Sequence, residues 1–348
     1  MPTPAELGYH MPAEWHRHTA TWLAWPKDPE TWPDRVAQVE EIYLQMMAAL
    51  APNEIVNLLV DNAETETAVR ARCIFNATEN IRYHQIPTVD SWIRDYGPNF
   101  LINDKAELAY NDWIFNAWGN KYKELKRDNS IPARLESLLK VPRFEPGIVM
   151  EGGSIEVNGA GCVLTTEQCL LNPNRNPNLS KNEIEQSLKN YLGVEKVLWL
   201  GEGIVGDDTD GHIDDIARFV APNVIVCAVE DDPEDANYQL LQDNLKRLRA
   251  MTNADGRPFD VVTLTMPGVV GGTSTNHRDL DRLPASYANF YIANDVVLAP
   301  VFGHANDARA LETLQRLFTS RRVVAVNCEP LAWGMGTIHC VTQQQPEP

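Results

Sequence analysis

Hydrophobic and polar positions along this chain form a repeating pattern of short apolar runs and longer amphipathic stretches. In four places a short β-branched run is followed by a polar turn rich in Asn, Asp or Pro, an amphipathic stretch and a second apolar run. Short apolar runs bounded by turn residues predict strands, and the amphipathic stretches predict helices. The pattern therefore predicts strand–turn–helix–strand units at residues 20–59, 161–200, 224–264 and 295–326.

Further extended runs without a helix lie between these units, for example at residues 100–110 and 290–292. A doubly wound sheet would alternate strands and helices without such additional runs. Units that recur every 60 to 80 residues or so instead indicate modules arranged around an axis. We therefore expect an α/β fold of repeated modules, and a single domain over residues 1–348.

Composition and charge limit the classes of partner. Hydrophobic residues make up 44% of the chain and charged residues 22%, as in an ordinary globular protein. The net charge of −18 argues against nucleic acid and anionic membranes as partners, and it would favour a small cation if it were focused in a cleft. Because no apolar stretch reaches about 18 residues and residues 1–10 lack a secretory pattern, we expect a cytoplasmic protein.

Six cysteines are present, but none forms a Cys-x-x-Cys pair, so the common zinc spacings are missing. Five of them lie in or beside apolar stretches and are interpreted as core residues. Cys340 differs because two glycines, Gly334 and Gly336, precede it. Spaced glycines let the backbone approach closely, so we expect a strand over residues 337–342 that holds the Cys340 thiol at its rim.

Two other segments carry candidate chemistry. Trp92 and Asp95 lie in a short segment bracketed by Pro87 and Pro98. A carboxylate and an aromatic face together can bind a planar cation, although a structured loop explains this segment equally well. Glu151 precedes two glycines, which indicate a turn or a close approach of the backbone to a ligand.

His212 and Asp214 follow an acidic loop at residues 207–210. If His212 begins a strand, both side chains point to the same face, about 6 to 7 Å apart, and can act on one small molecule. A divalent metal site is the rival interpretation, but the spacing matches no standard motif. His339 would face away from the Cys340 thiol on a strand, so it is interpreted as structural.

Taken together, these segments resemble the agmatine deiminase and bacterial-type peptidylarginine deiminase family of guanidino-group-modifying enzymes. The resemblance rests on residues 11–15, 25–26, 92–98, 115–119, 151–153, 211–214, 285–291 and 338–340. It implies the pentein fold, a five-bladed α/β propeller with pseudo-fivefold symmetry, and chemistry without a metal or organic cofactor. By position, the resemblance also implies that Cys340 is the nucleophile, that His212 is the general acid/base and that Glu151 orients it. It further implies that Asp95 and Asp214 bind the guanidinium and that Trp92 forms a wall of the pocket.

The resemblance implies hydrolysis of agmatine to N-carbamoylputrescine and ammonia, a step towards putrescine, through a covalent thiouronium on the cysteine. Deimination of peptidylarginine or free arginine is the alternative, and amidino transfer comes third. Outside this class, a papain-like cysteine protease and a non-catalytic metal- or polyamine-binding module remain open. The partner implied is a small cationic guanidino compound, and the family suggests a homodimer.

One electrostatic conflict is visible in the sequence. Carboxylates near Cys340 should raise the pKa of its thiol, which opposes formation of the nucleophilic thiolate. A bound guanidinium and an imidazolium at His212 would act in the opposite direction. We therefore expect substrate binding to help form the thiolate.

Overall fold

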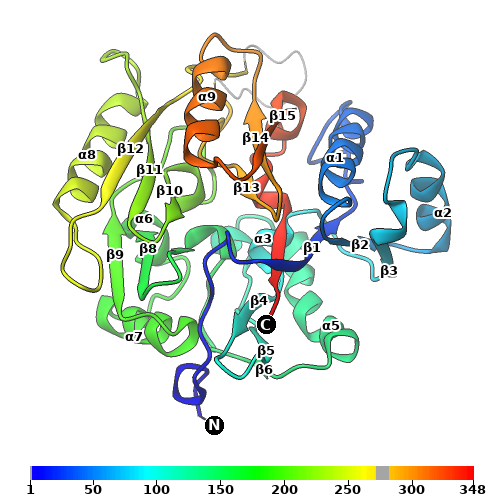
Figure 1. The fold of residues 1–348 in the computed structure, drawn as a ribbon, viewed down its shortest axis with the longest axis horizontal. Coiled ribbons are helices and arrows are strands. Elements are labelled where there is room, and N and C mark those ends of the chain that lie inside the picture. Colours follow the sequence, from blue (N-terminus) through cyan, green and yellow to red (C-terminus); the bar gives the residue numbers. More distant parts are fainter. Residues whose placement is uncertain (1, 272–281) are drawn as a thin grey trace.

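The chain forms five small β-sheets that surround a common axis (Figure 1). The computed structural model describes residues 2–271 and 282–348. In each sheet one strand pairs antiparallel with a second strand, and that second strand pairs parallel with a third. A helix joins the two parallel strands and lies on the outside of the ring.

We call these units blades and number them in chain order; blade 1 takes its antiparallel strand from the C-terminal end of the chain. Blade 1 contains β16 (Gln343–Pro346), β1 (His18–Ala24), α1 (Val36–Leu50) and β2 (Ile55–Val60), and blade 2 contains β4 (Asn99–Ile102), β5 (Leu108–Asn111), α5 (Ile131–Leu139) and β6 (Arg143–Phe144). Blade 3 contains β7 (Glu156–Val157), β8 (Cys162–Thr166), α7 (Lys181–Leu192) and β9 (Lys196–Leu200), and blade 4 contains β10 (Ala217–Ala221), β11 (Val224–Val229), α8 (Asn237–Ala250) and β12 (Asp260–Thr265). Blade 5 contains β13 (Tyr291–Ile292), β14 (Val296–Val301), α9 (Asp307–Leu317) and β15 (Arg322–Asn327).

Blade 1 has an additional helix and an additional strand at its outer edge. The other helices are short connections between blades or within them. These elements are α2 (Ala63–Arg72), β3 (Ile81–Gln85), α3 (Ile93–Tyr96), α4 (Ala117–Asn120), α6 (Glu167–Leu170) and α10 (Glu329–Ala332).

Helix α7 shows how the local sequence determines an outer helix. Ser180 caps its first turn by accepting a hydrogen bond from the backbone of Glu183, and the Glu183 carboxylate accepts one from the backbone of Ser180 in return. Gly193 ends the helix at a φ of 66°, which costs glycine little. Ile184 and Leu188, four residues apart, are buried on the face towards the sheet.

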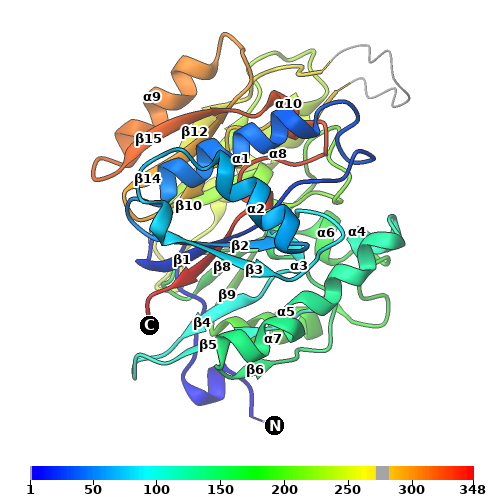
Figure 2. The same ribbon diagram turned by 90° about the vertical axis from the view of Figure 1, so that its right-hand side faces the viewer.

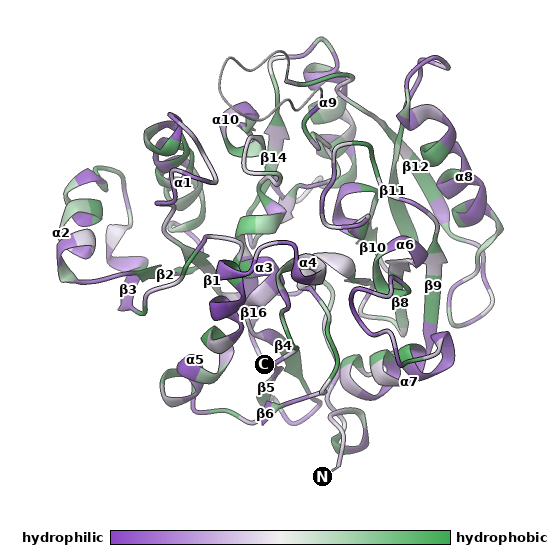
Figure 3. Ribbon diagram, turned by 180° about the vertical axis from the view of Figure 1, so that it is seen from behind, coloured by the Kyte–Doolittle hydropathy of each residue, from purple (hydrophilic) through white to green (hydrophobic). Residues whose placement is uncertain are grey.

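The middle strands of the blades are largely buried, and two of them, β11 and β14, are apolar along their whole length. Strands β8 and β14 are fully or almost fully buried along their length. Figure 3 shows the strands of blades 3 and 4 as mainly hydrophobic and the outer helix α8 as mainly hydrophilic. Within the described residues, every helix is too short or too polar to pass through a lipid bilayer.

Strand β16 closes the ring, because it pairs antiparallel with β1 at the other end of the chain. Gln343 lies opposite Trp22, and Pro346 lies opposite His18. Strand β16 also packs against β4 of blade 2. The described C-terminus consequently lies beside β1, as Figure 2 shows.

The five-bladed architecture expected from the family resemblance is confirmed, and so are the four predicted strand–turn–helix–strand units. The run at residues 100–110 contains the antiparallel strands β4 and β5. Blade 2 was not predicted as a unit, because its third strand, β6, has only two residues and leaves little pattern in the sequence. The predicted strand over residues 337–342 is wrong, since a 3₁₀ turn occupies His339–Val341 and the strand begins at Gln343.

Candidate active site

Every blade contributes a short segment that precedes its antiparallel strand, and four of these segments pack together near the axis. Helix α3 contacts the 3₁₀ turns η4 (Gly152–Ser154) and η6 (His339–Val341), and η4 contacts η5 (Ile213–Asp215). The segment before β13 joins them through Asn289, which contacts η6. The arrangement of the blades around an axis thus brings equivalent segments together at the centre.

The Cys340 thiol lies in η6 and is 8% exposed. Asn289 donates a hydrogen bond from Nδ2 to the Cys340 Sγ at 3.3 Å, and Asp214 Oδ2 lies 4.0 Å from the sulfur. Burial raises the pKa of Cys340 well above its ordinary value, and the charges of Asp214, Asp215 and Asp95 raise it further. The predicted effect of the carboxylates on the thiol is thus confirmed, and the thiol is neutral in the empty site.

Asp95 projects from α3 and is held by two donors. The backbone N–H of Gly153 donates to its Oδ1 at 2.9 Å, and Trp118 Nε1 donates to its Oδ2 at 2.8 Å. Burial nevertheless raises the pKa of Asp95 well above its ordinary value, and the nearby charges of Asp214 and Glu151 add to the shift. A cation that enters beside Asp95 would favour the ionised form of this carboxyl group.

His212 does not begin a strand, so the condition under which His212 and Asp214 would share one strand face is not met. His212 precedes the 3₁₀ turn η5, and the next strand begins at Ala217. Asp207 forms the tight turn by accepting hydrogen bonds from the backbone N–H groups of Gly211 and His212. His212 still faces the predicted cluster, because its Nδ1 lies 3.8 Å from Asp95 Oδ1.

Burial lowers the pKa of His212 to about 3, so its imidazole is neutral in the empty site. Glu151 is fully buried and accepts a hydrogen bond from Arg175 Nε at 2.9 Å on Oε1. In the part of the chain that the structure describes, Glu151 Oε2 and His212 Nε2 have no hydrogen-bond partner. The predicted orienting contact between these two side chains remains a prediction, supported by their proximity.

Glu151, His212 and Cys169 form the one group of three among the described residues whose ligand atoms could hold a metal ion; these atoms lie within 4.8 Å of one another. Metal binding would require a thiolate at Cys169. Burial raises the pKa of Cys169 well above its ordinary value, and the charge of Glu151 raises it further. Because the cationic Arg175 already occupies one oxygen of Glu151, the donor set fits a divalent cation poorly.

His339 lies in η6 next to the nucleophile and contacts two buried carboxylates. Its Nδ1 is 2.7 Å from Asp214 Oδ2, and its Nε2 is 2.7 Å from Glu14 Oε2. The interpretation of His339 as a structural residue that faces away from the thiol rested on a strand that is absent. Burial alone would raise the pKa of Asp214, but the hydrogen bond and charge of His339, with a contribution from the cationic Arg218, hold it below the ordinary value.

Two glycines leave the space that the site needs. A Cβ on Gly153 would lie 2.6 Å from His212 Nδ1 and 2.8 Å from Asp95 Oδ1. A Cβ on Gly336 would lie 2.6 Å from the Trp92 ring and 3.1 Å from the Cys340 sulfur. The glycines before the cysteine and after the glutamate are therefore required by close packing around the site.

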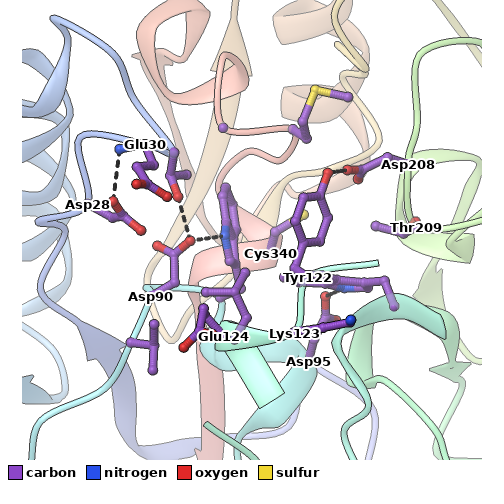
Figure 4. Close-up of a pocket in the computed structure, with 17 residues that line it drawn as sticks. Asp28, Glu30, Asp90, Asp95, Tyr122, Lys123, Glu124, Asp208, Thr209 and Cys340 are labelled. Carbon is purple, nitrogen blue, oxygen red and sulfur yellow. Dashed lines mark hydrogen bonds between the residues drawn. The ribbon is translucent and has the colours of Figure 1, made fainter. Parts of the chain in front are cut away.

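A cavity of about 270 Å³ opens onto Cys340, with Trp92 and Asp95 among its lining residues. The Trp92 indole donates to Asp90 Oδ2 at 2.9 Å and packs against Trp32 at 5.4 Å between ring centroids. Figure 4 shows acidic side chains on both sides of Cys340. Apart from Asp95, the acidic lining residues are Asp28, Glu30, Asp90, Glu124 and Asp208.

The sequence analysis missed three residues that contact the predicted site residues: Asn289, Trp118 and Arg175. Asn289 also accepts hydrogen bonds on Oδ1 from the backbone of His339 at 2.9 Å and from the Thr337 hydroxyl at 2.7 Å. Asn289 and Trp118 do lie within segments that carry the family resemblance. Their side-chain roles had no signal in spacing or composition, because each depends on a contact that forms only in the folded chain.

Comparison with known proteins agrees with this geometry. Agmatine deiminase from Ectopseudomonas mendocina is 39% identical, over 99% of this chain and 98% of the relative. A solved agmatine deiminase from Enterococcus faecalis matches with a TM-score of 0.93 and 37% identity, covering 100% of this chain and 98% of the other. A substrate-bound variant of agmatine deiminase from C. jejuni matches with a TM-score of 0.85 and 29% identity, over 97% and 96% of the two chains. Residues 10–346 match the model of the Porphyromonas-type peptidyl-arginine deiminase family, and the chain belongs to that family.

Proposed function

We propose that this protein hydrolyses agmatine to N-carbamoylputrescine and ammonia, through a covalent thiouronium on Cys340. The observation that carries the proposal is the position of the Cys340 thiol, at a cavity lined by Trp92, Asp95 and further acids. A thiol is a better nucleophile than water, and covalent attack divides a difficult hydrolysis into two easier steps. Relatives named agmatine deiminase over nearly the whole length support this substrate.

In this proposal Asp95 and Asp214 bind the guanidinium, and Trp92 forms a wall of its pocket. A carboxylate pairs with a guanidinium through parallel hydrogen bonds that fix the plane of the cation. Asp214 Oδ1 is buried and has no partner within the described residues, as expected for an oxygen that waits for a donor. The ionised Asp95 formed upon binding would supply the second carboxylate.

The protonation states fix the order of proton transfers. Since the Cys340 thiol and the His212 imidazole are both neutral in the empty site, an imidazolium at His212 must form during the reaction. His212 takes the proton that Cys340 loses when the guanidinium binds and the sulfur attacks its carbon, and it delivers that proton to the departing ammonia. Neutral His212 then activates the water that cleaves the thiouronium, and Glu151 orients the imidazole.

The walls of the cavity favour agmatine over free arginine. Its ionisable lining residues include six acids and one cation, Lys123. The distal ammonium of agmatine suits such a surface, whereas the carboxylate of free arginine would be repelled. Deimination of peptidylarginine is the second candidate, because the family model carries that name.

The test is ammonia release from agmatine, free arginine and a blocked arginine peptide, with wild type beside Cys340→Ala. We expect agmatine turnover in the wild type alone. Turnover of the peptide or arginine instead would support the same reaction mechanism but would show that agmatine is not the substrate. Cleavage of a peptide without arginine would indicate a protease, and binding without any turnover would indicate a polyamine-binding module. A homodimer stays a prediction of the family resemblance, and a cytoplasmic location stays a prediction from the sequence pattern.

A further inference from the structure

Glu14, His339 and Asp214 form a continuous buried line of hydrogen bonds that ends at the predicted guanidinium site. We propose that His339 is a positioning residue, a permanent imidazolium that holds one oxygen of Asp214 and keeps this carboxylate ionised for the substrate. The part of this proposal that concerns catalysis rests on the proposed function. The protonation of His339 itself does not depend on that function.

The geometry makes both ring nitrogens of His339 donors. Each nitrogen lies 2.7 Å from a carboxylate oxygen, and a carboxylate without its proton can only accept. A neutral ring would place a lone pair against one of these oxygens. His339 is 1% exposed and Asp214 is fully buried, so water does not relieve such a repulsion.

Glu14, on the far side of His339, is held in its ionised form by further donors. Arg218 Nη2 donates to Glu14 Oε1 at 2.8 Å, and the backbone N–H of Ile292 donates to the same oxygen at 2.8 Å. Arg94 Nη2 lies 3.4 Å from Glu14 Oε2. These contacts agree with the direction of the Glu14 pKa, which lies well below the ordinary value although burial opposes this.

The charges around His339 balance only when its ring is a cation. Three buried carboxylates face three buried cations in one connected group: Glu14, Asp214 and Glu156 with Arg94, Arg218 and His339. The other ionisable groups close to Asp214 are Asp95, Asp215, Cys340 and His212. A neutral His339 would leave one excess buried negative charge, which a proton on Asp214 or Glu14 would have to cancel.

The two oxygens of Asp214 therefore have different roles in the site. Oδ2 is occupied by His339, while Oδ1 is buried without a partner in the described part of the chain. Asp95, which lacks an imidazolium partner of this kind, has the opposite pKa shift. The two carboxylates at the predicted guanidinium site thus differ in how strongly their surroundings favour the ionised form.

Nitrogen-15 NMR of histidine-labelled wild-type protein tests the protonation state directly. At about pH 8.5 an ordinary histidine, with a pKa near 6.5, is neutral. Among the eight histidines we expect one ring with both nitrogens still protonated. A spectrum without such a ring would overturn the proposal, and this measurement needs no variant to fold.

Kinetics of His339→Gln test the consequence, with His18→Gln as the matched control. His18 is also a buried histidine, and its Nε2 is 2.7 Å from the Glu14 carbonyl oxygen, but it makes no contact with Asp214. For His339→Gln we expect kcat/KM for agmatine to fall about 100-fold at neutral pH. We also expect partial recovery as the pH rises and ionises Asp214. The control should keep the pH profile of the wild type.

The pH dependence separates positioning from simple structural damage. A uniform fall across the whole pH range in His339→Gln, or the same profile in both variants, would overturn the positioning role.

Ligand binding in a Cys340→Ala background gives a second readout. There, His339→Gln should release about two protons for each agmatine bound instead of about one, because Asp214 then ionises together with Asp95. Failure of all guanidino substrates would overturn the proposed function instead, while the NMR result would still stand.

Discussion

At the scale of single residues, the candidate site is a set of buried ionisable groups that shift one another in opposite directions. Asp95 and Asp214 both face the predicted guanidinium position, but the pKa of Asp95 is raised and that of Asp214 is lowered. The difference arises from the partners, since neutral donors hold Asp95 and His339 holds Asp214. The empty site therefore has less negative charge than its composition indicates.

Binding of agmatine should release a proton from Asp95. The guanidinium favours the carboxylate, so the complex binds fewer protons than the free protein, and affinity must rise with pH up to the raised pKa. Calorimetry of Cys340→Ala with agmatine, in two buffers that differ in ionisation enthalpy, measures this release as about one proton per ligand. Asp95→Asn should abolish the release, and a pH-independent affinity in the parent would contradict this account.

The Cys340 thiolate should appear only when a guanidino compound is bound. Burial and three carboxylates raise the pKa of the free thiol, and a cation in contact with the sulfur lowers it. The thiolate absorbs in the ultraviolet, so a difference spectrum between wild type and Cys340→Ala reports it. We expect a signal with a slowly reacting guanidino ligand and none without it. A signal that is unchanged by the ligand would rule out assistance by the substrate.

At the scale of elements, the site is built from turns and not from strands. All six residues with predicted roles occupy or directly precede short helical turns: Trp92, Asp95, Glu151, His212, Asp214 and Cys340. Each turn precedes an antiparallel strand, which fixes it to a rigid sheet. This arrangement places side chains from distant parts of the sequence against one another with little loop freedom.

Gly153→Ala should remove activity while the fold remains. The added methyl would overlap His212 Nδ1 and Asp95 Oδ1, and Gly153 has no positive φ that would add backbone strain. We expect kcat/KM to fall at least about 100-fold, because small displacements of reacting groups are costly. Gly201→Ala is the control, since its nearest neighbour is the flexible end of Arg247 at 3.3 Å. Equal activity of the two variants would contradict this reading of the turn.

At the scale of the whole molecule, one strand holds the ring closed. Strand β16 connects blade 1 to the segment that carries Cys340, and Gln344 on it accepts a hydrogen bond from Arg94 at 2.7 Å. The same strand contacts β4. Stability and activity are therefore linked through the last residues of the described chain.

Truncation after Thr342 should lower stability and remove activity together. It deletes β16 and leaves the paired edge of β1 open, at a cost of roughly 2–4 kcal/mol for a few backbone hydrogen bonds. Thermal and urea unfolding measure the loss. Truncation after Pro346 is the control, because Glu347 contributes an exposed ion pair with Arg17 and one backbone hydrogen bond. Similar unfolding curves for the two truncations would show that β16 does not close the ring.

The sequence allowed the repeated units and the set of site residues to be predicted, because strands and helices have periodic patterns and the motifs are ordered along the chain. It did not allow the 3₁₀ turns at His212 and Cys340 to be predicted, since β-branched neighbours there favour a strand. The contact of His339 with Asp214 depends on that turn, and Asn289 reaches Cys340 only through the assembled ring. Contacts between blades leave no local signal in the sequence.

The ring closure also sets an order of events during synthesis. Asp95, Glu151, His212 and Asp214 all precede Cys340 and β16, so the chain that leaves the ribosome first contains every partner of the thiol but not the thiol itself. Until β16 adds to β1, blade 1 presents an open strand edge. Nascent or prematurely terminated chains should therefore not react with guanidino compounds, and their open strand edge should pair readily with other chains. The chain becomes able to react in the same step in which β16 closes the ring.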